Sequence, residues 1–430
     1  MHSRFGPLRT WFCVLLGASA CAGARAASGA GARNAASAER VSPANDNLTA
    51  GRMAALSDTV RRVLDKALRD SAFPGAYAVV GNHLGVLAAY GVGRFDWAPS
   101  PPPDENTLWD LASLTKVVGT TTAVMQLVET GVIALDAPVR HYLPEWSGPG
   151  KGRVTVRHLL THSSGLPAWR GLREQATNPA EALALVYATP LDTAPGVRMV
   201  YSDLGVIILG RVVERASGER LDLYLERRVF AALAMRSTGF RPDSMLRDRI
   251  APTEYDSVRG RLVHGEVHDE NAYLLGGVSA HAGLFSTAHD LTRFARMYLN
   301  GGELDGARIL APATIAEFTR VQDARLSNRA LGWETPTGGN SAGHRMSGLA
   351  FGHTGFTGTS LWIDPARDAF VLLLSNRVNP SRENRRIVAV RVLLADAVMA
   401  ALSGPLPSSL PNAPVGPAGR TSPPSTAHPQ

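Results

Sequence analysis

Short, largely apolar segments separated by turn residues occur near both ends of the body of this chain, and that pattern predicts β-strands. One strand pair is expected at 76–80 and 86–91, and a second at 359–363 and 369–374. Between these pairs the apolar residues recur at helical spacing. Helices are therefore predicted to begin at Ser57 and to cover 114–130, 155–162, 205–217 and 383–402.

Strands at both ends around a mostly helical middle predict an α+β fold, with a sandwich-like arrangement of helices on a sheet. We expect an antiparallel sheet that is built from both ends of the chain, flanked by helices and interrupted by a long helical insertion. No internal repeat is visible in the sequence. The working body is predicted to be one domain at residues 56–403.

The first 26 residues are typical of a secretory signal peptide. Arg4 and Arg9 precede a short apolar stretch from Trp11 to Leu16, and small-x-small cleavage patterns follow at 18–20 and 24–26. We therefore expect export to the periplasm or the medium. Cleavage before Cys21 would instead expose that residue for lipidation, so a lipid anchor at Cys21 is the alternative.

Two segments outside the body have the composition of disordered chain. Residues 27–55 are rich in Ala, Gly, Ser and Asn, and residues 404–430 are rich in Pro, Ser and Ala. We expect a disordered linker and a disordered tail. No later segment is apolar enough to predict a transmembrane span, since the most apolar late helix carries Arg391 and Asp396.

Composition excludes several functions. The net charge is +7, but it is spread without a basic run or an aromatic-basic stripe, so no nucleic-acid partner is expected. The two cysteines lie at Cys13 and Cys21, which leaves the body without a disulfide or a cysteine metal site. Only three lysines occur, at Lys66, Lys116 and Lys151, so amine chemistry has three candidate side chains.

The first candidate for chemistry is Ser113-Leu114-Thr115-Lys116, at the start of an apolar helix. Residues three apart lie on one helical face, so Lys116 Nζ can approach Ser113 Oγ. A serine hydroxyl becomes a useful nucleophile only when a neighbouring base takes its proton. Alone, this spacing is a weak signal.

Two further short motifs follow. Tyr201-Ser202-Asp203 leads into the helix at 205–217, where Asp203 alone would suggest a helix N-cap. His353-Thr354-Gly355 lies in a stretch with three glycines between 352 and 358, which implies that the backbone closely approaches a ligand or another segment.

In this order and separation, the three motifs resemble those of the serine β-lactamase and penicillin-binding protein superfamily. The similarity is greatest to its class C-related branch, which includes D-alanyl-D-alanine carboxypeptidases and esterases. The stretches 154–167 and 276–287 are also similar to that branch, and the resemblance covers about 56–402.

The resemblance implies a role for each matched residue. Ser113 would be the nucleophile that forms an acyl-enzyme, and Lys116 and Tyr201 would share the proton handling in an order that stays open. The backbone N–H groups of Ser113 and Phe356 would form the oxyanion hole. His353, Thr354 and Gly355 would contact the polar end of the substrate, next to Asp203.

Two residues depart from the usual family pattern. Asp203 stands where the family usually has Asn, and an anion there would hold Lys116 charged and leave more of the base function to Tyr201. His353 stands where β-lactamases usually have Lys, so efficient β-lactam hydrolysis is less expected. A histidine near its reference pKa would bind a substrate carboxylate better as the pH falls through about 6.5.

Other candidate sites are weaker. Gly339-Asn340-Ser341-Ala342-Gly343 matches the nucleophile elbow of α/β-hydrolases, but it is expected in a loop without the required strand and helix. His158 and His162 are expected to be core or polar-face residues. A metal site formed by His264, His268, Asp269 and Glu270 is less expected than a polar loop that lines the cleft.

The sequence thus predicts an exported serine hydrolase that needs no cofactor and no metal. Its partner is expected to be a small-molecule or peptide substrate, with a D-amino-acid peptide or cell-wall fragment first, a carboxylic ester second and a β-lactam third. The alternative, motivated by Asp203, is a catalytically silent penicillin-binding or sensor module.

Overall fold

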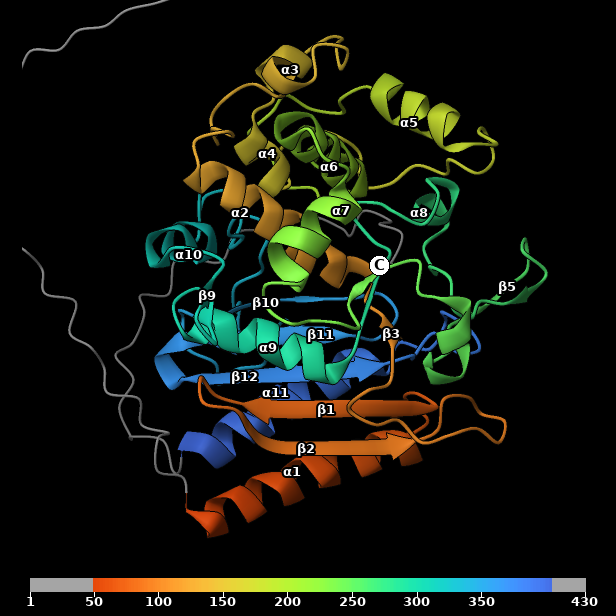
Figure 1. Ribbon diagram of the computed structural model, residues 1–430, viewed down its shortest axis with the longest axis vertical. Coiled ribbons are helices and arrows are strands. Elements are labelled where there is room, and N and C mark those ends of the chain that lie inside the picture. The colour runs from red at the N-terminus through yellow and green to blue at the C-terminus, as the bar shows by residue number, and fades with distance from the viewer. Residues whose placement is uncertain (1–48, 404–430) are drawn as a thin grey trace, which may run out of the picture. The chain divides into compact units, whose positions relative to one another are not determined.

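A five-stranded antiparallel sheet joins the two ends of the body. The computed structural model describes residues 49–403. The sheet has the strand order β10–β11–β12–β1–β2 (Figure 1). Its strands are β1 (Gly75–Gly81), β2 (Val86–Gly93), β10 (Phe351–Thr354), β11 (Ser360–Asp364) and β12 (Ala369–Ser375). Because β1 pairs with β12, the predicted closure of the sheet by both chain ends is confirmed.

Helices cover both faces of this sheet, so its strands are apolar on both sides. In β12, Phe370 and Leu372 belong to the apolar core of the helical insertion, whereas Val371 and Leu373 belong to a second core on the opposite face. Helices α1 (Ala50–Arg69) and α11 (Ile387–Ser403) cover that second face, and α9 (Ala288–Leu299) packs on the first. Figure 1 shows α9 in front of the sheet and α11 behind it.

The long segment between β2 and β10 supplies the rest of the first core, and helices are its main regular structure. More of its residues lie in turns and loops than in helices, so the expectation of a mostly helical middle is confirmed only for its regular elements. Small sheets and hairpins lie between its helices. Besides α9, its α-helices are α2 (Thr122–Glu129), α3 (Val139–Tyr142), α4 (Val156–Leu160), α5 (Pro179–Ala188), α6 (Asp203–Ser217), α7 (Leu221–Leu225), α8 (Glu270–Leu274) and α10 (Pro312–Thr319). Its short strands are β3 (Trp109–Asp110), β4 (Gly239–Phe240), β5 (Tyr255–Asp256), β6 (Arg261–Leu262), β7 (Leu284–Ser286), β8 (Glu303–Leu304) and β9 (Ala307–Arg308). The α+β expectation is therefore confirmed.

The first helix begins earlier than the sequence predicts. Helix α1 starts at Ala50 with Thr49 as its N-cap, whose side chain accepts a hydrogen bond from the Arg52 N–H. Residues 50–55, assigned above to the linker, are therefore helical, and the start at Ser57 was wrong. These residues are exposed and Leu56 is the first buried one, so the apolar pattern starts after the helix does.

The remaining terminal predictions fall outside the structure. The signal peptide at 1–26, the linker up to residue 48 and the tail at 404–430 lie outside the described residues. Within residues 49–403, no helix has both the length and the apolar character that crossing a bilayer requires.

Leu373→Ala should test the core between the sheet and the α1–α11 pair. Leu373 is 1% exposed on the central strand β12, so its removal is expected to lower the free energy of unfolding by about 2–5 kcal/mol. Leu393→Ala on α11 is the control, because Leu393 is 53% exposed and should change stability little. Urea unfolding measures both, and equal effects would contradict this packing.

Candidate active site

Ser113 lies in a strained turn between a strand and a helix. Strand β3 ends at Asp110, whose side chain accepts a hydrogen bond from the Ala112 N–H at 2.8 Å. Ala112 has φ +45°, a left-handed conformation that costs a residue with a Cβ about 1–3 kcal/mol. Ser113 follows in a single turn of 3₁₀ helix and is half-buried. Its neighbours thus hold the backbone in a conformation that it would not adopt alone.

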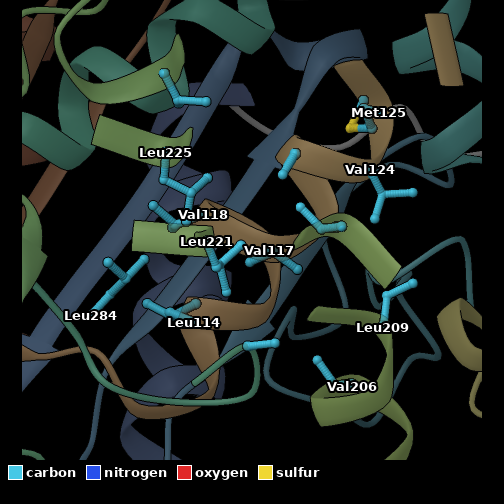
Figure 2. Close-up of a cluster of buried hydrophobic side chains, with 14 of the residues drawn as sticks. Leu114, Val117, Val118, Val124, Met125, Val206, Leu209, Leu221, Leu225 and Leu284 are labelled. Atoms are coloured by element: carbon cyan, nitrogen blue, oxygen red, sulfur yellow. The ribbon is translucent and has the colours of Figure 1, made fainter. Parts of the chain in front are cut away.

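A π-helical turn, Lys116–Thr121, continues from Ser113 into α2 and is anchored by apolar packing. Figure 2 shows Leu114, Val117 and Val118 among side chains that include Leu221 and Leu225 of α7. The wider cluster also contains Leu284 of β7 and Val206 and Leu209 of α6. Because this side of the turn is fixed in the core, Lys116 is directed to a defined polar position.

Lys116 is buried with its ammonium group beside three oxygen atoms. Its Nζ lies 3.0 Å from Ser113 Oγ, 2.9 Å from the His281 carbonyl oxygen and 2.7 Å from Asp203 Oδ1. Burial has the largest single effect and lowers the pKa of Lys116, but the charges of Asp203 and Tyr201 and the hydrogen bonds to them together outweigh it, and the net pKa is raised. Three acceptors for three N–H groups fit a charged amine.

Tyr201 lies against this ion pair, just before α6. The Lys116 Nζ is 5.0 Å from the centre of the Tyr201 ring, and the centres of the His162 and Tyr201 rings are 4.5 Å apart. Burial raises the pKa of Tyr201, although the Lys116 charge opposes the rise. The Tyr201 hydroxyl is buried beside Lys116. The resting state is therefore a neutral phenol beside an ammonium ion.

The segment that follows strand β10 contacts the Ser113 turn through Gly355, Thr357 and Thr359. Thr357 Oγ1 donates to the Asp110 carbonyl at 2.7 Å, and Thr359 Oγ1 donates to the Leu111 carbonyl at 3.0 Å. A Cβ on Gly355 would lie 2.3 Å from the Leu111 carbonyl oxygen, so only glycine permits this approach. The glycine-rich stretch thus approaches the Ser113 turn, as expected for a close backbone contact.

Two arginines hold the loop that carries Phe356: Arg377, which is buried just after β12, and Arg391, which is half-buried on α11. Arg377 Nε donates to the Phe356 carbonyl at 2.8 Å, and Arg391 Nη2 donates to the Gly355 and Thr359 carbonyls at 2.7 Å each. Arg377 also lies 4.4 Å from the centre of the Phe356 ring. These contacts turn the carbonyl groups of the loop towards the arginines.

Two backbone amides near the serine have no internal partner. Neither the Ser113 N–H nor the Phe356 N–H donates a hydrogen bond to another group in the described chain. Such groups are rare in buried positions unless a ligand or water pairs with them. A pair of them beside an alcohol can stabilise an oxyanion.

His353 lies next to Tyr201, with their ring centres 5.9 Å apart, but its pKa differs from the one expected from the sequence. Its Nδ1 is 2.8 Å from the Thr354 carbonyl oxygen, which can only accept, so Nδ1 carries the hydrogen and Nε2 is an acceptor. Burial lowers the pKa of His353 to about 4. The expectation that this residue titrates near pH 6.5 was wrong, because the side chain is 98% buried on β10.

A second polar pair behind Lys116 was missed by sequence reasoning. His281 Nε2 lies 2.9 Å from Asp269 Oδ1, and the side chains of Asp203, Asp269 and His281 offer ligand atoms within 4.8 Å of one another. The ammonium group of Lys116 supplies a positive charge at this cluster. The stretch 276–287 had been noted as family-like, but nothing in its spacing indicated a role for His281.

The group proposed as a weaker metal site is not brought together. His264 contacts backbone carbonyls, His268 contacts Glu254, Asp269 contacts His281 and Glu270 contacts Arg382. His268 also stacks on Phe356 with ring centres 5.6 Å apart, so this segment supports the site, in line with the polar loop that was expected.

The other sequence candidates have local structural contacts. Ser341 lies in a loop, as predicted, and its Oγ accepts a hydrogen bond from Trp362 Nε1. His158 Nδ1 accepts from the Thr155 N–H in the cap of α4. His162 is buried against Tyr201, and its Nδ1 accepts from the Ser202 N–H. His162 is therefore part of the candidate site, which its spacing did not show.

Comparison with known proteins agrees with this geometry. The family model described as Beta-lactamase matches residues 60–395. A Salmonella typhimurium protein named "Putative D-alanyl-D-alanine carboxypeptidase" is 31% identical over 361 residues, which cover 74% of this chain and 82% of that protein. Two solved structures share the fold. One is "EstCE1, a hydrolase with promiscuous acyltransferase activity", which has a TM-score of 0.64 and 23% identity over 81% of this chain and 99% of that chain. The other is a class C beta-lactamase, which has a TM-score of 0.67 and 20% identity over 82% of this chain and 98% of that chain. The chain therefore belongs to the β-lactamase family of serine hydrolases.

Proposed function

We propose that this hydrolase cleaves a small amide or ester through an acyl-enzyme on Ser113. The observation that carries the proposal is the 3.0 Å contact between Lys116 Nζ and Ser113 Oγ, next to the ring of Tyr201. In this reaction Ser113 Oγ attacks the substrate carbonyl, the leaving group departs with a proton, and water then hydrolyses the ester on Ser113.

We assign the base function to Tyr201 and the charge stabilisation to Lys116. Lys116 is the paired cation, since Asp203 raises its pKa, and its ammonium group cannot accept the Ser113 proton. Tyr201 is a phenol at rest, so it first releases its proton to water. The phenolate then accepts the Ser113 proton, and the phenol that results gives this proton to the leaving group. Burial opposes the phenolate by raising the pKa of Tyr201, whereas the charges of Lys116 and Arg329 favour it.

The oxyanion that forms during attack is proposed to bind the two amides without internal partners, at Ser113 and Phe356. The arginine and threonine contacts described above fix the Phe356 loop before substrate binds. Preorganised donors cost no rearrangement at the moment of reaction, which is why such contacts matter for rate.

The substrate class we propose first is a D-amino-acid peptide or cell-wall fragment, followed by a carboxylic ester and a β-lactam. The name of the Salmonella relative supports the first class, and the acyltransferase activity ascribed to EstCE1 supports a broader acyl-transfer chemistry. We also propose export by the segment at 1–26, with Cys21 as the alternative lipid anchor, because cell-wall substrates lie outside the cytoplasm.

Replacement of Ser113 by alanine is expected to abolish acylation and turnover. A fluorescent penicillin or a fluorophosphonate should label the wild type and leave Ser113→Ala unlabelled, and steady-state rates on D-Ala-D-Ala peptides and 4-nitrophenyl esters should fall ~10³-fold or more. Ser341→Ala is the matched control and should behave as wild type. Equal labelling of wild type and Ser113→Ala would show that the nucleophile is another residue. Labelling of the wild type without turnover of any substrate would favour the silent binding module.

Asp203→Asn should move the acidic limb of the profile of kcat/KM against pH to lower pH. The Asp203 charge raises the pKa of both Lys116 and Tyr201, so its removal makes either base available at lower pH. The expected displacement is about one to three pH units. Asp203→Glu, which keeps the charge, is the control. A limb that stays in place in Asp203→Asn would mean that this carboxylate does not set the base.

His353→Gln is expected to leave the shape of the pH dependence of KM unchanged between pH 5.5 and 8. His353 is neutral throughout that range because burial lowers its pKa to about 4. The measurement is KM for an anionic substrate in wild type and variant across the range. A wild-type KM that falls as the pH drops through about 6.5, with no such fall in the variant, would contradict the assigned state of His353.

A further inference from the structure

One acceptor of the Lys116 ammonium group is a main-chain carbonyl, and the side chain of the same residue is held by polar partners of its own. The His281 carbonyl oxygen lies 2.9 Å from Lys116 Nζ. The His281 ring is buried, with Nε2 at 2.9 Å from Asp269 Oδ1 and Nδ1 at 2.8 Å from Ser279 Oγ. Because both ring nitrogens have a partner, the ring cannot turn without breaking a buried hydrogen bond.

The direction of the hydrogen bond between His281 and Asp269 follows from the state of the carboxyl group. Burial raises the pKa of Asp269, but its interactions with His281, a backbone hydrogen bond and the charge of Lys116 together outweigh burial and hold this pKa below its usual range. A carboxylate can only accept, so His281 Nε2 donates to it. An aspartate in such a contact fixes the orientation of an imidazole ring. Ser279 is buried, so this chain of contacts holds a ring and presents no second nucleophile to solvent.

The backbone next to His281 is held against the turn that carries Lys116. Thr120, in the same π-helical turn as Lys116, donates from Oγ1 to the Ala280 carbonyl at 2.7 Å. A Cβ on Gly210 of α6 would lie 2.4 Å from Ala280 Cβ, so α6 also packs closely on this backbone. The His281 carbonyl is therefore presented to Lys116 by a segment that is fixed both through its backbone and through its ring.

Asp269 is also a second negative charge close to Lys116. Polar side-chain atoms of Asp203, Asp269 and His281 lie within 4.8 Å of one another. Lys116 Nζ lies 2.7 Å from Asp203 Oδ1, so its ammonium group adjoins this cluster. The attraction between Asp269 and Lys116 is mutual, so it favours the ammonium ion as it favours the carboxylate.

We propose that Asp269 and His281 are positioning residues for Lys116, which hold the carbonyl acceptor and the negative charge that keep its ammonium group beside Ser113. The inference rests on the proposed function, because it concerns the same nucleophile, and it adds two residues that act through Lys116. Asp269, which the sequence placed in a polar loop or a weak metal site, acts here through His281.

The rate of covalent labelling by a fluorophosphonate tests the proposal, because it separates chemistry from binding. Time courses at several probe concentrations give the maximal rate constant, kinact, and the concentration for half-saturation, KI. The final labelled fraction counts the molecules that are folded and active. A merely structural role would lower this fraction and leave kinact unchanged in the molecules that still react, whereas a positioning role lowers kinact itself.

Asp269→Asn should lower kinact by roughly ten-fold to a hundred-fold and change KI by less than about three-fold, since it weakens a charge-assisted hydrogen bond network at Lys116. Asp269→Glu keeps the charge and should recover part of the loss. His281→Gln should lower kinact by a similar factor. The double variant should be no slower than the slower single variant, because both substitutions act through one step.

Asp396→Asn is the matched control. It breaks another His–Asp pair of the same length, in which His344 Nδ1 lies 2.9 Å from Asp396 Oδ2 on α11. This pair has no contact with Lys116, so kinact should stay within about two-fold of wild type.

A kinact within about two-fold of wild type in Asp269→Asn, an equal loss in Asp396→Asn, or fully additive losses in the double variant would overturn the proposal. If Asp269→Asn does not fold, His281→Gln decides in its place. Labelling of Ser113→Ala at the wild-type rate would refute the acyl-enzyme at Ser113. An unlabelled Ser113→Ala together with a wild-type kinact in Asp269→Asn would refute only the positioning role.

Discussion

The buried ion pair between Lys116 and Asp203 is the interaction on which the site depends. Removing two charges from water costs several kcal/mol per ion, so such a pair persists only where other contacts support it. Lys116 has two further acceptors besides the carboxylate, and Asp203 is the first residue of α6, where the helix dipole favours a negative charge. The pair fixes the ammonium group beside Ser113, and the charge of Asp203 raises the pKa of both Lys116 and Tyr201.

The second constraint is the contact between the Ser113 turn and the loop after β10. One segment comes from the start of the helical insertion and the other from the C-terminal part of the sheet. Thr357 and Thr359 bind the carbonyls of Asp110 and Leu111, while Arg377 and Arg391 bind the other side of the loop. The sheet that closes the two chain ends therefore also brings Ser113 close to the loop that carries Phe356.

Local patterns predicted the elements of this fold and the residues of its three motifs. The strand pairs were found because each strand is a short apolar segment next to turn residues, and Ser113 and Lys116 were found because three residues make nearly one helical turn. Arg329, His162 and His281 were missed because they reach the site from separate segments, and only the folded chain places them there. The state of His353 could not be predicted either, since its pKa depends on burial and on the Thr354 carbonyl.

The charge of Lys116 can be measured directly, because the chain has only three lysines. In protein labelled with lysine enriched in ¹³C at Cε, the signals of Lys66, Lys116 and Lys151 can be assigned by replacing each lysine in turn. Lys66 is exposed and burial lowers the pKa of Lys151, so the three titrations should differ. The ion pair with Asp203 predicts that Lys116 stays an ammonium ion through pH 10. Titration of Lys116 at or below pH 8 would contradict the account and make Lys116 the base.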